Sequence, residues 1–191
     1  MISVRGWAVL AASCIACAAS AQVPVIDVKP LPLATKRIVA SSDECIVWRR
    51  ELAFARTVEA HDLRAFQSFL HVGTVFDAGT TDADRGGDEV AKSWAEIVEG
   101  RTIALRWRPG IVHIGGEPGI ALSRGPYILQ RLQAGATVYR VGMYQTIWVR
   151  DGHDGSWRVL YDGSATTGQP MEDRAAAERW VEEQPMSDCA P

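Results

Sequence analysis

The pattern of apolar and polar positions changes about halfway along the chain. In the first half, apolar residues recur every three or four positions, which is typical of one face of an amphipathic helix. Ser41 and Glu44 have the spacing of a capping box, which marks a helix start. Three helices are predicted, over 41–60, from Asp62 to about residue 70, and from Gly87 through Ile97.

The second half is predicted to form strands, because runs rich in β-branched and aromatic residues are separated by short turns. The predicted strands of this half cover 103–114, 119–132, 137–150 and 156–166, and a further short strand, 72–78, is predicted between the second and third helices. Close spacing and short turns favour an antiparallel meander. Helices followed by long antiparallel strands indicate an α+β fold. We expect a cone-shaped domain in which a curved antiparallel sheet wraps around three N-terminal helices and leaves a conical hollow.

Both ends of the chain lie outside this pattern. Residues 1–21 have a short basic start, a small-residue apolar run and the sequence Ala19-Ser20-Ala21, which predict a signal peptide cleaved near Ala21. The mature protein is then periplasmic or secreted and has no transmembrane segment. Cys14 and Cys17 keep a lipid-anchored form open as the weaker alternative. Residues 22–40 predict an extended linker, 41–168 the domain, and 169–191 a C-terminal helix and tail.

Composition and charge narrow the classes of partner. The chain has 191 residues, of which 47% are hydrophobic, and its formal net charge is −3. Such a chain can bury a core of ordinary size, and it has no basic surface for nucleic acid. Removal of the signal peptide leaves Cys45 and Cys189, which predict a disulfide in an oxidising compartment. Two separate thiols are the alternative.

Strand alternation indicates which side chains share a face. Three sets follow: Ala121, Ser123, Gly125 and Tyr127; Gly142, Tyr144, Thr146 and Trp148; and Arg158, Leu160 and Asp162. If these faces line the hollow, two phenols and an indole surround the Asp162 carboxyl. The opposite face of the 137–150 strand is more uniformly apolar, so it remains an alternative interior.

We assign Asp162 and Tyr127 as the candidate proton-handling pair, since a buried carboxyl can act as an acid or base and a phenol can stabilise an oxyanion. Asp77 is a second candidate acid near the mouth of the pocket. The remaining candidates, Trp94, Trp107, Tyr144 and Trp148, are interpreted as pocket wall. The structural alternatives are a strand-end cap for Asp162, a turn residue for Asp77 and simple packing for the rings.

Several segments resemble the nuclear-transport-factor-2-like superfamily. They are "RGGDEVAKSW" (85–94), "LRWRPG" (105–110), "ALSRGPY" (121–127), and "GMYQTIW" (142–148) followed by "DGSWRVLYD" (154–162). More narrowly, the chain is similar to the SnoaL-like, uncharacterised secreted branch with a ketosteroid-isomerase-like fold. The resemblance implies a cone-shaped α+β barrel, an interior pocket and often a dimer built on the outer face of the sheet. It covers both enzymes and non-catalytic binding domains.

The expected function is binding of a small apolar molecule, with cofactor-free acid–base chemistry of an isomerase, dehydratase or cyclase kind if the domain is catalytic. The alternative is a non-catalytic dimerisation or interaction module of the cell envelope. A homodimer is expected in either case. Neither a metal nor a cofactor is expected, because the four histidines lack metal-ligand spacing and no phosphate loop or dinucleotide fingerprint occurs.

Overall fold

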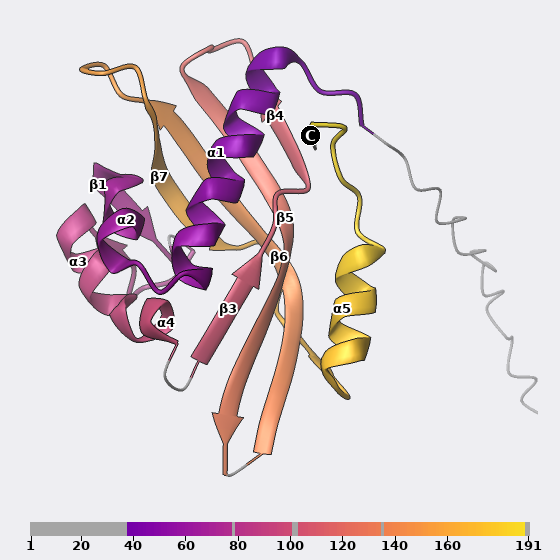
Figure 1. Cartoon of the computed structure of the whole chain (residues 1–191). Helices are drawn as coiled ribbons and strands as arrows, with labels where there is room; N and C mark the ends of the chain where they lie inside the picture. The colour runs from indigo at the N-terminus through magenta and orange to yellow at the C-terminus, as the bar shows by residue number, and fades with distance from the viewer. Residues whose placement is uncertain (1–37, 78, 101–102, 135, 190–191) are drawn as a thin grey trace, which may run out of the picture. The chain divides into compact units, whose positions relative to one another are not determined.

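The computed structural model describes residues 38–77, 79–100, 103–134 and 136–189 (Figure 1). The predicted signal peptide and most of the predicted linker lie outside these residues. The helices are α1 (Ser42–Glu59), α2 (Leu63–Ser68), α3 (Gly87–Ser93), α4 (Ala95–Glu99) and α5 (Arg174–Glu182). No helix in these ranges is both long and apolar enough to cross a membrane.

The first helix begins where the sequence predicts. The Ser41 backbone N–H donates to Glu44 Oε2 at 2.7 Å, and the Glu44 N–H donates to Ser41 Oγ at 3.2 Å, which completes the capping box. The third predicted helix, in contrast, is two helices. The apolar pattern continues through Trp94, but α3 ends at this residue and α4 begins after it, so the chain changes direction there.

The strands form one curved, unclosed sheet in the order β2-β1-β7-β6-β5-β3, while β4 pairs with β5 and β8 with β6. Their bounds are β1 (Leu70–Phe76), β2 (Asp84–Arg85), β3 (Ile103–Trp107), β4 (Ile111–Ile114), β5 (Ile120–Gln133), β6 (Ala136–Arg150), β7 (Trp157–Ser164) and β8 (Gln169–Met171). The long β5–β6 hairpin is the middle of the sheet (Figure 1). The α+β prediction is therefore confirmed.

Two details of the predicted antiparallel sheet are wrong. β1, which lies outside the predicted meander, pairs with β7 in parallel, because a long connection lets it reach the far edge of the hairpins. The strand predicted over 103–114 is interrupted between β3 and β4, where the chain crosses close over β5. A Cβ on Gly125 would lie 2.1 Å from the Arg108 carbonyl oxygen, so this crossing requires glycine. On either side of this break, β3 and β4 both pair with β5.

The two faces of the sheet are covered by different helices. The face that carries Tyr144 and Trp148 joins the main core beneath α1, together with Phe54 of that helix. On the opposite face, Val141 is fully buried against Ala177 of α5. The alternative that placed the Val141 face inside the hollow is therefore wrong, because α5 supplies a cover of its own.

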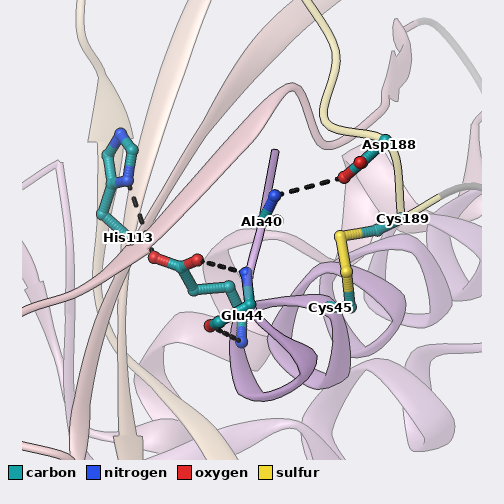
Figure 2. The surroundings of a disulfide bond; sticks show 7 residues. Ala40, Glu44, Cys45, His113, Asp188 and Cys189 are labelled. Atoms are coloured by element: carbon teal, nitrogen blue, oxygen red, sulfur yellow. Dashed lines mark hydrogen bonds and ion pairs between the residues drawn. A yellow bond between two sulfur atoms is a disulfide. The ribbon is translucent and has the colours of Figure 1, made fainter. Parts of the chain in front are cut away.

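The C-terminal segment returns to the start of α1, where Cys189 and Cys45 form a disulfide with Cα atoms 5.1 Å apart. Figure 2 shows that Asp188 accepts a hydrogen bond from the Ala40 backbone N–H beside this bond, at 3.1 Å. In the same view, Glu44 lies 3.7 Å from the His113 ring. The structure thus pairs the two cysteines that the sequence predicts to pair.

Candidate functional site

A cavity of about 210 Å³ lies between the helices and the inner face of the sheet. Its wall contains six of the residues predicted for the site: Asp77, Trp94, Trp107, Tyr127, Tyr144 and Asp162. Phe54, Ile97, Leu105 and Leu129 complete an apolar surface around them. Residues far apart in sequence therefore meet because α1, the Trp94 turn and four strands converge here.

A bulge in β7 directs Asp162 into this cavity. Thr146 pairs with Asp162 and Ile147 with Tyr161, but Trp148 pairs with Val159, so Leu160 is an extra residue on β7. The predicted grouping of Arg158, Leu160 and Asp162 on one face is therefore wrong. Such bulges change the direction in which a side chain points and are common near active sites.

The surroundings of Asp162 favour its protonated form. Burial raises the pKa of this carboxyl from its ordinary value of 3.8 to about 7, and the nearby Glu51 and Asp77 act in the same direction. A hydrogen bond from Thr146 Oγ1, at 2.5 Å, opposes the rise. A group with this pKa is present in both protonation states near neutral pH, which is the property that general acid–base chemistry requires.

Each of the two phenols lies opposite a glycine across the β5–β6 ladder. Tyr127 pairs with Gly142, and Tyr144 pairs with Gly125. A Cβ on Gly142 would lie 2.7 Å from the Tyr127 hydroxyl oxygen, and a Cβ on Gly125 would lie 2.9 Å from the Tyr144 ring. The glycines thus make the space in which both rings lie over the sheet and reach the cavity.

A buried acid behind the wall, Glu51 of α1, was not among the predicted site residues. Its side chain is fully buried and both carboxyl oxygens accept indole N–H groups, Oε1 from Trp107 at 2.7 Å and Oε2 from Trp148 at 2.8 Å. Burial raises its pKa, and hydrogen bonds from Trp107, Trp148, Ser123 and Tyr144 oppose the rise.

Glu51 connects to the cavity through Tyr144. The Tyr144 hydroxyl lies 3.3 Å from Ser123 Oγ, and both side chains interact with the Glu51 carboxyl. Burial, followed by the charge of Glu51, raises the pKa of Tyr144 far above its ordinary value. Tyr144 is therefore a neutral phenol that can donate or accept a hydrogen bond.

The other candidates are placed as follows. Asp77 lines the cavity and is also a turn residue, with φ of 52° and a carbonyl that accepts the Thr80 N–H at 2.8 Å. Burial, with the charge of Asp84, raises its pKa. Trp148, predicted as wall, lies fully buried behind the wall and contributes its N–H to Glu51.

The fold matches solved structures of nuclear transport factor 2-like proteins. A superfamily protein from Salmonella enterica serovar Typhimurium aligns with a TM-score of 0.54 and 15% identity, over 70% of this chain and 95% of that one. A ketosteroid isomerase-like protein from Erwinia carotovora aligns with a TM-score of 0.53 and 15% identity, over 66% and 100%. At this identity the likeness is one of fold. No protein-family model and no curated protein matches the chain.

Proposed function

We propose that the domain binds a small, largely apolar molecule in its cavity and carries out cofactor-free acid–base chemistry of an isomerase, dehydratase or cyclase kind. The observation that carries the proposal is that Asp162 and Tyr127 line one apolar cavity. The volume of this cavity, about 210 Å³, lies below the roughly 300–1,000 Å³ of pockets that bind drug-sized ligands. The ligand is correspondingly small.

In this proposal Asp162 takes a proton from the bound molecule and returns it at another atom. A pKa of about 7 suits both steps at neutral pH. Tyr127 donates a hydrogen bond to the oxygen on which negative charge develops, a role whose loss typically lowers turnover by about 10²–10³-fold. The rings of Trp94 and Trp107 hold the apolar part of the molecule and exclude water.

The compartment and the narrower relationship are part of the same proposal. The disulfide between Cys45 and Cys189 supports an oxidising compartment, since such bonds persist outside the cytosol. We place the mature protein in the periplasm or outside the cell, after cleavage near Ala21, and within the SnoaL-like secreted branch.

The decisive experiment is native mass spectrometry of the mature protein purified from the periplasm, followed by denaturing analysis of any released compound. A retained small molecule supports the proposal and identifies the compound to assay with the Asp162→Asn and Tyr127→Phe variants. Retention that is unchanged in both variants, with unchanged turnover, contradicts the assigned roles. A ligand-free protein shifts the weight to the second candidate.

The second candidate is a non-catalytic homodimer or interaction module, and an apolar row on the outer face of the sheet favours it. Leu122, Ile147 and Tyr161 lie in register on neighbouring strands. Leu122 is 36% and Tyr161 42% exposed, and a second copy of the domain would cover them. Sedimentation of the wild type and of Leu122→Asp tests this face, because a dimer built on it dissociates in the variant; the non-catalytic candidate also requires that the purified protein be ligand-free.

A further inference from the structure

We infer that Glu51 sets the direction of the Tyr144 hydroxyl proton, and so decides whether the part of the cavity wall that Tyr144 forms donates or accepts a hydrogen bond. The inference rests on the proposed function and deepens it, because it assigns the ligand class: an apolar molecule with an oxygen acceptor that faces Tyr144. It makes Glu51 a positioning residue that acts through Tyr144.

The first step concerns the chemistry of the groups around Glu51. The indole N–H groups of Trp107 and Trp148 each occupy one carboxyl oxygen, and an indole N–H can only donate. The remaining polar neighbours are the hydroxyls of Ser123 and Tyr144, which can donate or accept. When Glu51 gains or loses a proton, these two hydroxyls must therefore reorient their own protons to keep a hydrogen bond with it.

The second step compares the two protonation states. An ionised Glu51 only accepts, so the hydroxyls turn their protons toward it and the Tyr144 oxygen presents lone pairs to the cavity. A protonated Glu51 has a proton to donate, and only a hydroxyl oxygen can accept it. The Tyr144 hydroxyl, 3.3 Å from Ser123 Oγ, is then free to direct its own proton into the cavity.

The third step identifies the state that prevails. Glu51 is fully buried, which disfavours its charge. The titratable and charged groups that act on this cluster are Asp162, Tyr144 itself and Arg108; Asp162 and Glu51 are acids that disfavour each other's ionisation. Arg108 acts on Tyr144 but also donates to the carbonyls of Val181 and Gln184. Burial and the neighbouring acid therefore favour the neutral form of Glu51, in which Tyr144 donates, while the hydrogen bonds from the indoles and hydroxyls favour the charged form.

Infrared titration tests the state of Glu51 directly. We expect a protonated-carboxyl band of Glu51 at pH 7 that is lost in Glu51→Gln and kept in Asp162→Asn, beside a band of Asp162 that is lost only in Asp162→Asn. In Asp162→Asn the Glu51 midpoint moves to lower pH, because the competing charge is gone. In Tyr144→Phe the midpoint moves to higher pH, because the ionised state loses a donor. Tyr144→Phe leaves both indole contacts in place, so it remains informative where Glu51→Gln unfolds.

Ligand preference tests the consequence for the cavity. Cyclohexanone and methylenecyclohexane have the same shape, and only the ketone accepts a hydrogen bond. We expect the ketone to bind roughly tenfold more tightly at neutral pH, which is the size of one hydrogen bond. The pH series is measured in the Asp162→Asn background, because Asp162 titrates in the same cavity. There the preference is smaller in Tyr144→Phe, declines as pH rises through the Glu51 midpoint, and becomes independent of pH when Glu51→Gln is added.

The outcomes separate the two proposals. Equal binding of both probes by the wild type, or a ketone preference that ignores the Glu51 midpoint, overturns the inference and leaves the proposed function standing. Binding of neither probe counts against the proposed function. In that case the infrared data decide the inference, which fails if Tyr144→Phe leaves the midpoint unchanged and holds if the midpoint rises.

Discussion

Trp107 donates its indole N–H to Glu51 at 2.7 Å, while the same side chain forms part of the cavity wall. Trp148 donates to the other carboxyl oxygen from behind that wall. The indole of Trp107 thus connects the buried carboxyl of Glu51 to the cavity wall. A change at either end is expected to affect both stability and binding.

The first prediction concerns the indole contacts of Glu51. Trp148→Phe removes the indole N–H that donates to Glu51 Oε2, and this buried oxygen then lacks that hydrogen bond. The residues that line the cavity stay unchanged. We expect the free energy of unfolding to fall by about 1–3 kcal/mol. Denaturant unfolding measures the loss. The same substitution in a Glu51→Leu background is the control, and an equal loss in both backgrounds would show that only packing is involved.

The second prediction is a pH dependence of stability from Asp162. Its pKa is about 7 in the folded protein and has an ordinary value of 3.8 in the unfolded chain. Between these values the folded protein keeps a proton that the unfolded chain has lost, so rising pH favours unfolding. The stabilisation is fully present below pH 3.8 and is lost as pH rises through about 7.

Asp162→Asn is the variant that isolates this effect. Between pH 3.8 and about 7, the free energy of unfolding should decline more steeply with pH for the wild type than for Asp162→Asn. A tenfold change in an ionisation constant corresponds to about 1.4 kcal/mol, so the difference is measurable. The raised pKa of Glu51 acts in the same direction in both proteins, and more weakly in Asp162→Asn, where the competing charge is absent. Parallel curves would contradict the placement of Asp162 in a desolvating cavity.

Much of the fold could be predicted because local patterns and tertiary packing agree. The capping box at Ser41 lies where α1 begins, and strand alternation correctly placed Tyr127 and Tyr144 on the inner face. Six of the seven predicted acids, phenols and indoles line one cavity. Alternation suffices for these because β5 and β6 pair without interruption from residue 120 to 149.

The rest depends on interactions that no local pattern contains. The extra residue at Leu160 changes the phase of β7, and it is recognisable only from the register with β6. Glu51 lies between Val47 and Ala55 at helical spacing, in the buried stripe of α1. A charged residue in an apolar stripe was the available signal, but its indole partners come from strands 56 and 97 residues further along the chain.

The third prediction concerns the space beneath Tyr127. Gly142→Ala would place a Cβ 2.7 Å from the Tyr127 hydroxyl oxygen, so the ring must move. We expect a loss of about 1–3 kcal/mol in unfolding free energy, the usual cost of overpacking, together with altered probe binding. Gly116→Ala is the matched control, because nothing lies within 4 Å of the added atom. If Gly142→Ala lowers the free energy of unfolding no more than Gly116→Ala does, the position of the Tyr127 ring does not depend on its cross-strand glycine.

The fourth prediction concerns the bond that joins the two ends of the domain. Cys45 and Cys189 are separated by 144 positions, so their disulfide restricts a long loop of the unfolded chain. The Cys45→Ser/Cys189→Ser variant should lose about 2–5 kcal/mol of unfolding free energy. Denaturant unfolding of wild type and variant, each with and without reductant, provides the measurement.

The reductant arm separates the bond from the side chains. Reduction should bring the wild type close to the double variant and leave the variant itself unchanged. Two hydrogen bonds near the disulfide should then weaken first. In one the Ala40 N–H donates to Asp188, and in the other the Ser187 N–H donates to the Gly110 carbonyl at 2.8 Å. Faster hydrogen exchange at the Ala40 and Ser187 amides would report this weakening. A wild type that reductant does not affect would mean that the thiols are unpaired in solution and that α5 holds the C-terminal segment in place.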